Sequence, residues 1–291
     1  MELELKEAKH PMGAAQATYD SLVGIDEQKS ALIGMLSFFF DKKKLGGWLK
    51  KHHKDGVPFL GDITNGTPLI ILEGDVGCGK TALAHSAATP LAKALDTRVI
   101  CFETPSNIRG GGRVGEISAR ITEAFEKAKA KLKEGDAGIF IIDEADDVAT
   151  DREQNQAHHE DKAGLNVLIK QIDAISKEGK SLAVILITNR LKVLDPAVVR
   201  RATLVVNFSR PDKEARQKVF TAILAGTGAK TAEIELLVKA SERPDHPYSF
   251  SDLVQRIGRQ SLMKAISQDK PFNASIVHEV IGLVDPSPMI K

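Results

Sequence analysis

Several features that mark other protein classes are scarce in this sequence. Cysteine occurs only at Cys78 and Cys101, in no metal-binding spacing, which predicts two reduced thiols and a cytoplasmic protein. No apolar run approaches the ~20 residues that span a bilayer, and residues 1–7 lack the apolar core of a signal peptide. The net charge is +1, from 40 basic and 39 acidic residues. A broad nucleic-acid footprint is therefore not expected, and only a local basic stripe remains open.

Short apolar segments alternate with helical patterns through the first two thirds of the chain. Because strands buried on both faces read as continuous apolar runs, this alternation predicts an α/β fold with a parallel sheet flanked by helices. The expected strands are residues 69–72, 99–102, 139–142, 182–188 and 204–208. After Pro211 the apolar spacing is helical only. We therefore expect a weakly ordered arm over residues 1–20, an α/β domain over 21–210, and a small helical domain over 211–291.

A glycine-rich stretch follows the first expected strand. Residues 74–81 read Gly-Asp-Val-Gly-Cys-Gly-Lys-Thr and fit the phosphate-loop pattern G-x-x-x-x-G-K-[ST]. A strand, a glycine turn and a helix N-terminus direct several backbone N–H groups at one phosphate. Lys80 is expected to reach the β- and γ-phosphates of ATP, and Thr81 to bind Mg²⁺. The residues predicted here to bind the cofactor are Gly74, Asp75, Val76, Gly77, Cys78, Gly79, Lys80 and Thr81.

Two carboxylates end the apolar strand at 139–142. Asp143 is expected to bind Mg²⁺, and Glu144 to activate a water for attack on the γ-phosphate, because phosphoryl transfer depends mainly on positioning and charge neutralisation. The competing interpretation is a solvated acidic turn at the end of a strand. The preceding phosphate loop makes that interpretation the weaker of the two.

Further polar groups follow the next strand. Asn189 ends the strand at 182–188 and is a candidate to contact the γ-phosphate and the attacking water, although Asn is also common in turns. Residues 194–201 end in Arg200 and Arg201. We expect this pair to act as an arginine finger on a neighbouring subunit's phosphate site. A solvated basic helix end is the alternative.

These four features, in this order, resemble the AAA+ ATPases, and within them the branch that contains protein-remodelling rings. The resemblance covers roughly residues 18–290. Residues 20–25 are similar to the branch's adenine-side segment, which implies nucleotide contacts by Val23 and Gly24. Residues 250–253 are similar to the start of the lid helix and imply a nucleotide contact by Arg256.

The sequence departs from the branch at two places. The branch often has a second finger arginine where this chain has Thr203. A single finger, in which Arg201 fits best, resembles the pachytene-checkpoint type of remodeller, in a minimal bacterial-type form. An aromatic residue usual in the central-pore loop is replaced by Arg113, after three glycines. The substrate contacts implied in its place are Ile108, Arg109, Arg113 and Val114, and a purely structural glycine turn is the alternative.

The resemblance implies an ATPase that uses ATP and Mg²⁺. It implies a ring, most simply a homo-hexamer, that remodels a protein substrate, and the pachytene-checkpoint family acts on HORMA-domain proteins. The alternative is a DNA-directed AAA+ protein of the transposition-helper or replication-loader type, against which the near-neutral charge argues. A switch that binds ATP without hydrolysing it is a third interpretation, and Glu144 argues against it.

Overall fold

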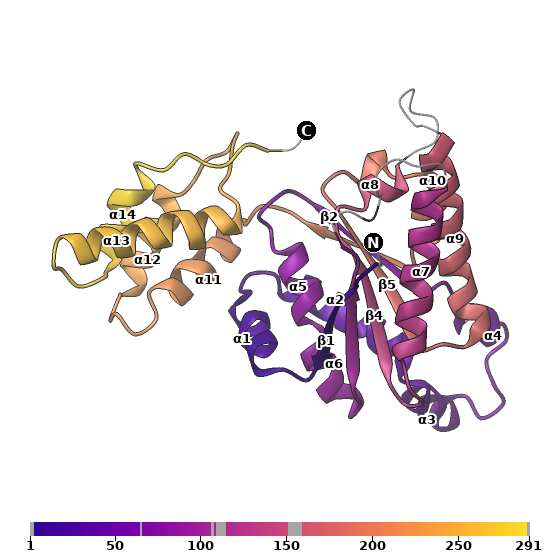
Figure 1. Cartoon of the computed structure of the whole chain (residues 1–291). Coiled ribbons are helices and arrows are strands. Elements are labelled where there is room, and N and C mark those ends of the chain that lie inside the picture. Colours follow the sequence, from indigo (N-terminus) through magenta and orange to yellow (C-terminus); the bar gives the residue numbers. More distant parts are fainter. Residues whose placement is uncertain (1–2, 65, 106–107, 109–114, 151–158, 290–291) are drawn as a thin grey trace. The chain divides into compact units, whose positions relative to one another are not determined.

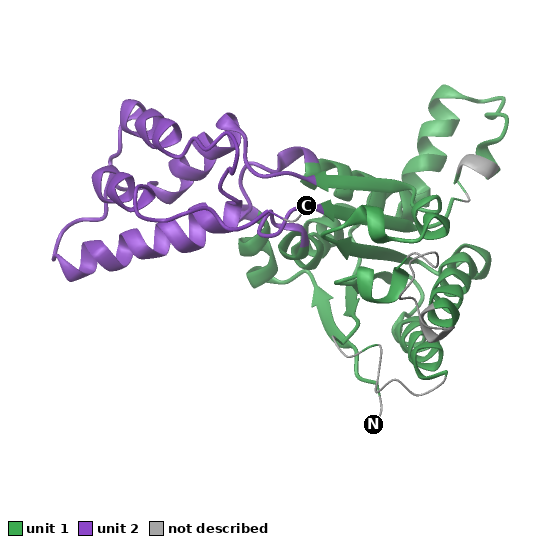
Figure 2. Cartoon of the chain, turned by 90° about the horizontal axis from the view of Figure 1, so that it is seen from above, with its two compact units in different colours: residues 1–19, 28–73, 81–207 green, residues 20–27, 74–80, 208–291 purple. Residues whose placement is uncertain are grey.

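The computed structural model describes residues 3–64, 66–105, 108, 115–150 and 159–289. The chain forms two compact units, each assembled from separate stretches of sequence (Figure 2). Unit 1 comprises residues 1–19, 28–73 and 81–207, and unit 2 comprises residues 20–27, 74–80 and 208–291. The expected domain boundary near residue 210 lies close to residue 208, where the last stretch of unit 2 begins. Unit 2 also contains the phosphate loop and the segment that leads into α2 (Asp26–Phe40).

A six-stranded sheet forms the centre of unit 1, with helices on its two faces (Figure 1). Its strand order is β1-β3-β4-β5-β2-β6. The pairs β3–β4, β4–β5 and β5–β2 are parallel, as the alternation of apolar segments and helices predicts. The strand bounds are Lys6–His10 (β1), Leu69–Gly74 (β2), Val99–Glu103 (β3), Ala137–Ile142 (β4), Leu182–Thr188 (β5) and Leu204–Phe208 (β6).

The core of unit 1 explains why its strands read as uninterrupted apolar runs. Successive strand residues point to opposite faces, so a strand covered on both sides is apolar at every position. On one face, α7 (Glu116–Lys131) and α9 (His159–Glu178) contribute most of a buried cluster with β4 and β5. The rings of Phe125 and Phe140 lie 4.4 Å apart between their centroids, which joins α7 directly to β4.

The N-terminal residues differ from the expected arm. β1 pairs antiparallel with β3 along residues 6–10 and so closes one edge of the sheet. The short strand reads Lys-Glu-Ala-Lys-His, which is too polar for the apolar rule that identified the other strands. It is followed by α1 (Gly13–Ser21). Residues 41–66 contain α3 (Lys42–His52) and α4 (Leu60–Thr64).

The remaining helices of unit 1 connect the strands. They are α5 (Lys80–Ser86, whose first residue belongs to unit 2), α6 (Ala88–Leu95), α8 (Asp146–Ala149) and α10 (Pro196–Val199), with a 3₁₀ turn at Leu191–Val193. α10 begins at Pro196, after the buried Asp195 carboxylate accepts a hydrogen bond from the Ala197 N–H at 2.7 Å. This N-cap fixes the start of the helix that ends at the two arginines.

After Pro211 the described part of unit 2 contains helices and no strand, as the sequence predicts. The helices are α11 (Lys213–Ile223), α12 (Thr231–Ala240), a π-helical segment (Asp252–Gly258) that continues into α13 (Arg259–Ser267), and α14 (Ala274–Ile281). They enclose a buried cluster of their own, which includes Phe220, Leu253 and Val277. No helix in the described ranges is long and apolar enough to cross a bilayer.

Candidate active site

The phosphate loop has backbone angles that only glycine adopts without strain. Gly74, Gly77 and Gly79 have φ values of 130°, 73° and 94°. A Cβ on Gly74 would lie 2.0 Å from the Phe208 carbonyl oxygen, and one on Gly77 would lie 2.8 Å from Ser249 Oγ. All three glycines are therefore favoured by conformation, and Gly74 and Gly77 also by close packing within unit 2.

Lys80 is folded back into its own loop. The residue is only 6% exposed, and its Nζ donates hydrogen bonds to the carbonyl oxygens of Gly74 and Asp75, both at 2.8 Å. The loop thus presents a buried ammonium beside the N-terminus of α5, the combination that suits a phosphate group. The donor set of this half of the site fits a nucleoside triphosphate.

The thiol of Cys78, in the same loop, is unreactive at neutral pH. Burial, and after it the charge of the nearby Asp75 carboxylate, raise the pKa of its thiol to about 11. At neutral pH the group stays a thiol, since a thiol reacts or binds metal only after losing its proton. Its contribution is packing, with Sγ 3.8 Å from the Val76 carbonyl oxygen.

Within unit 1, Thr81 and Asp143, the two residues that the sequence predicts to bind magnesium, are in contact. Thr81 Oγ1 donates to Asp143 Oδ2 at 2.8 Å, while Asp143 Oδ1 accepts from the Glu144 N–H at 2.8 Å. A hydroxyl and a carboxylate in contact are hard oxygen ligands of the kind that Mg²⁺ prefers. Glu144 is exposed, and its φ of 52° is unusual for a residue with a side chain, a strain often found at functional positions.

Asn189 is held in place by the residues on either side of it. Thr188 Oγ1 donates to Asp146 Oδ1 at 2.8 Å and accepts from the Arg190 N–H at 3.0 Å. The Arg190 guanidinium also donates to Asp146 Oδ2, at 3.1 and 3.3 Å. Because Asp146 accepts hydrogen bonds from both Thr188 and Arg190, the backbone at Asn189 has little conformational freedom. The Ala145 N–H also bonds to the Ile187 carbonyl oxygen at 2.8 Å, so the ends of β4 and β5 meet at the same edge.

The two arginines after α10 differ sharply. Arg201 forms a two-pronged ion pair with Asp173 of α9, with N–O distances of 2.9 and 3.1 Å, and its Nη1 donates to the Ala197 carbonyl oxygen. The side chain of Arg200 is exposed and forms no hydrogen bond or ion pair with any residue that the structure describes, while its backbone N–H donates to the Pro196 carbonyl oxygen at 3.0 Å.

The predicted adenine and lid residues all lie in unit 2. Val23 packs against the helical core, and Gly24, with a φ of 80°, lies so close to Phe250 and Ala215 that a Cβ would be about 3 Å from each. Arg256 sits in the π-helical segment, where its Nη1 donates to Asp252 Oδ1 at 2.7 Å and to the Asp285 carbonyl oxygen at 2.8 Å.

Of the predicted pore-loop contacts, Arg109, Arg113 and Val114 lie outside the described residues. Ile108 is described and is 6% exposed, packed in the core of unit 1 against residues that include Phe125 and Phe140. Its apolar side chain serves the core, so the structure argues against a substrate contact by Ile108.

Three further functional candidates escaped the sequence reasoning. They are Asp146, which fixes Asn189, and two buried charged residues of unit 2, Arg210 and Asp252. Asp252 had a detectable signal: with Ser249 it forms the pattern S-x-x-D at the start of the lid helix, and the two residues exchange capping hydrogen bonds at 2.9 and 3.1 Å. Arg210 had none, since a lone arginine before a proline carries no pattern.

Comparisons with known proteins agree with this site. The family model described as ATPase family associated with various cellular activities (AAA) matches residues 70–210. CD-NTase-associated protein 6 of Escherichia coli strain MS 115-1 is 37% identical over 281 residues, which cover 92% of this chain and 89% of the relative. The protein of the same name from Escherichia coli strain KTE188 is 33% identical over 272 residues, with 92% and 91% covered.

Two solved structures have the same fold over almost the whole chain. Trip13 in the structure of the E. coli MS115-1 HORMA:CdnC:Trip13 complex superposes with a TM-score of 0.92 at 34% identity, and 99% of this chain and 98% of that one are covered. Rhizobiales Trip13 gives a TM-score of 0.77 at 31% identity, with 97% and 98% covered. The chain therefore belongs to the AAA ATPases, in the family that contains CD-NTase-associated protein 6, and is an ATP-hydrolysing enzyme.

Proposed function

We propose that this ATPase uses Mg²⁺-dependent ATP hydrolysis to remodel a HORMA-domain protein. The observation that carries the chemistry is the 2.8 Å hydrogen bond between Thr81 and Asp143, which brings together the two predicted magnesium ligands. The substrate class is supported by the similar chain in the E. coli HORMA:CdnC:Trip13 complex, which shares this fold over nearly its full length. The two free, buried cysteines fit the reducing cytoplasm that the sequence predicts.

In this proposal the chain's own groups divide the work of phosphoryl transfer. Thr81 and Asp143 would hold Mg²⁺, which neutralises charge on the phosphates. Lys80 would exchange its two carbonyl partners for phosphate oxygens, Glu144 would accept a proton from the attacking water, and Asn189 would orient that water.

We further propose that catalysis is completed between subunits, in a ring that is most simply a homo-hexamer. Arg200 is the better candidate for the finger, because Arg201 already satisfies its guanidinium on Asp173 and Ala197. A cation without a carboxylate partner among the described residues is available to neutralise transition-state charge on a neighbouring protomer. Arg201 would then hold the end of α10 in place. Arg109, Arg113 and Val114 remain the proposed substrate contacts.

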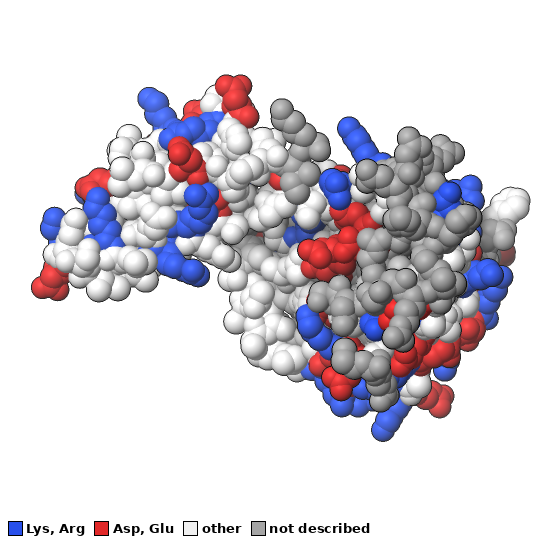
Figure 3. All heavy atoms as spheres, turned by 45° about the horizontal axis from the view of Figure 1, so that its top comes forward, with Lys and Arg blue, Asp and Glu red and all other residues white. Residues whose placement is uncertain are grey.

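The DNA-directed alternative has less support. On the face shown in Figure 3, Lys and Arg side chains are interspersed with Asp and Glu over the described surface, so no basic stripe is seen there. A DNA-binding groove requires cations that follow the phosphate backbone. A protein substrate fits this mixed charge better.

The function is tested by trapping the ATP-bound enzyme with Glu144→Gln. We expect this variant to bind ATP, to assemble in sedimentation, and to co-elute with a purified HORMA-domain protein from the same source only when ATP is present. Lys80→Ala should abolish co-elution, and Asp147→Asn, an exposed neighbouring carboxylate, should hydrolyse ATP normally. ATP-dependent assembly without any HORMA co-elution would contradict the substrate, and salt-sensitive DNA binding in its place would support the alternative.

A further inference from the structure

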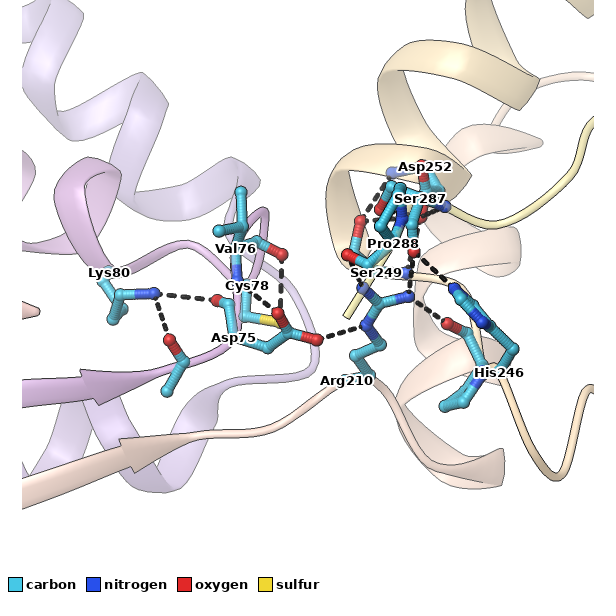
Figure 4. A network of polar contacts seen from close by, with 12 residues as sticks. Asp75, Val76, Cys78, Lys80, Arg210, His246, Ser249, Asp252, Ser287 and Pro288 are labelled. Atoms are coloured by element: carbon cyan, nitrogen blue, oxygen red, sulfur yellow. Dashed lines mark hydrogen bonds and ion pairs between the residues drawn. The ribbon is translucent and has the colours of Figure 1, made fainter. Parts of the chain in front are cut away.

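Arg210 is a buried cation at the junction between β6 and the helical part of unit 2. It is 8% exposed and follows Phe208, whose carbonyl oxygen accepts a hydrogen bond from the Asp75 N–H at 3.1 Å. The guanidinium Nε donates to Asp75 Oδ2 at 2.6 Å (Figure 4). A buried charge is costly unless its donors are satisfied, so the partners of the other two nitrogens matter.

Two of those three partners come from the C-terminal tail, residues 285–289, and the third is Pro247. Nη1 donates to the carbonyl oxygens of Pro247 and Ser287, the latter at 2.8 Å, and Nη2 donates to the Pro288 carbonyl oxygen at 2.9 Å. Arg210 therefore contacts the phosphate loop with one nitrogen and the tail with the other two, as Figure 4 shows. Among the residues that the structure describes, Nη2 has its partner in the tail alone.

The tail is itself fixed by a second buried charge, Asp252, which is 1% exposed. Its Oδ2 accepts hydrogen bonds from the Ser287 N–H at 3.1 Å and the Ser287 Oγ at 2.8 Å. Burial alone would raise the pKa of Asp252, but the hydrogen bonds from Arg256, Ser249 and Ser287 outweigh it and hold the pKa well below its ordinary value. The carboxylate thus stays ionised and keeps the tail in place beside Arg210.

In the phosphate loop, Asp75 contacts both Arg210 and Lys80. Asp75 accepts the Val76 N–H on Oδ1 at 2.8 Å, and its carbonyl oxygen accepts Lys80 Nζ at 2.8 Å. A continuous set of contacts therefore runs from Ser287 through Arg210 and Asp75 to Lys80, all within unit 2.

We propose that Arg210 is a positioning residue through which the C-terminal tail sets the shape of the phosphate loop and so the affinity for nucleotide. The inference rests on the proposed use of this loop for ATP. Arg210 touches neither substrate nor the reacting groups; it orients Asp75, and Asp75 orients the loop and Lys80. When the tail is bound to Asp252, every nitrogen of the guanidinium has a hydrogen-bond acceptor, and the phosphate loop keeps one conformation. When the tail is released, Arg210 loses two of its acceptors and no longer holds Asp75 in one orientation.

The test is a double-mutant cycle between the tail and Arg210, read out as the Kd of fluorescent methylanthraniloyl-ADP. Ser287→Pro removes both hydrogen bonds to Asp252 and should weaken binding about tenfold, and Arg210→Gln should weaken it by a similar factor. In the double variant we expect no further loss, because the tail acts through Arg210. Met289→Ala, an exposed tail substitution, is the control and should bind like the parent.

Two results would overturn the proposal. One is a double variant whose losses multiply, which would mean that the tail and Arg210 act independently. The other is a folded Arg210→Gln protein with parental affinity. Arg210→Lys should restore only part of the affinity, since an ammonium cannot replace the planar fork. If Arg210→Gln does not fold, a double-mutant cycle of Asp75→Asn with Ser287→Pro tests the same coupling between the tail and the phosphate loop. Failure of the parent itself to bind nucleotide would instead refute the proposed function.

Discussion

Arg201 and Asp173 form a two-pronged ion pair that ties the end of α10 to α9. The Arg201 Nε and Nη2 lie 2.9 and 3.1 Å from the two carboxylate oxygens, and the hydrogen bonds that they donate to Asp173 raise the pKa of the guanidinium above its ordinary value. Its third nitrogen bonds the Ala197 carbonyl oxygen at 2.8 Å. Arg201 is therefore fully engaged within its own subunit, whereas Arg200 next to it is exposed.

This difference gives a prediction about the arginine finger. Arg200→Ala should lower kcat by about 10³-fold while nucleotide affinity is retained, since a finger acts on the transition state. Arg201→Ala and Asp173→Ala should each cause a smaller loss, about tenfold, and to the same extent, because both release the end of α10. Steady-state ATPase assays together with nucleotide titrations measure these effects, with Lys192→Ala as the surface control.

The same variants can contradict the assignment. If Arg201→Ala abolishes hydrolysis while Asp173→Ala retains the parental rate, Arg201 is the finger and the ion pair is released in the assembled ring. This outcome would restore the finger that the sequence favoured.

The contact between Thr81 and Asp143 predicts how activity depends on magnesium. Thr81→Ala removes a hydroxyl that donates to Asp143 Oδ2 at 2.8 Å, and should raise the Mg²⁺ concentration for half-maximal ATPase activity about tenfold. Thr81→Ser keeps the hydroxyl and is the matched control, with an expected parental requirement. Equal magnesium requirements for Ala and Ser at this position would show that the hydroxyl is not a ligand.

Asp146 predicts a positioning effect on Asn189. Asp146→Ala breaks the bonds to Thr188 Oγ1 and Arg190 on either side of Asn189, and should lower kcat about tenfold with little change in nucleotide affinity. Asn189→Ala should lower kcat at least as much, and the double variant should be no worse than Asn189→Ala. Asp147→Ala, in the same helical turn but exposed, is the control. Multiplicative losses would separate Asp146 from Asn189.

The sequence predicts the parts of this molecule that depend on local patterns. The parallel strands follow from apolar runs, and the phosphate loop from its glycines, because each pattern is contained in a few neighbouring residues. β1 was missed because an edge strand needs no apolar run, and its charged residues face solvent.

The missed site residues depend on contacts between distant segments. Arg210 finds its partners at Asp75, Pro247 and Ser287, separated from it by up to 135 residues. Asp146 meets Thr188 because β4 and β5 end at the same edge, a register that no single segment encodes. The burial of Ile108 likewise depends on packing with distant residues. The local sequence, next to a glycine run, implied a substrate contact instead.

His10 predicts how the stability of unit 1 depends on pH. The residue is 3% exposed, with Nδ1 2.8 Å from Thr89 Oγ1 and no hydrogen-bond partner for Nε2 in the part of the chain that the structure describes. Burial, and then the charge of His85, lower the pKa of His10 below its ordinary value. The unfolded chain therefore binds this proton at a higher pH than the folded chain does, and stability falls as pH drops below about 6.5.

His10→Asn keeps a polar atom near the Thr89 hydroxyl but cannot titrate in this range. We expect the free energy of unfolding of the parent to fall more steeply between pH 7.5 and 5.5 than that of the variant. The difference in slope can reach about 1.4 kcal/mol per pH unit, the limit for one proton. Urea denaturation followed by circular dichroism measures it, with the exposed His278→Gln as the control. Parallel slopes for the parent and His10→Asn would show that His10 binds its proton with the same pKa in the folded and unfolded chains, and that its burial contributes no pH-dependent stability.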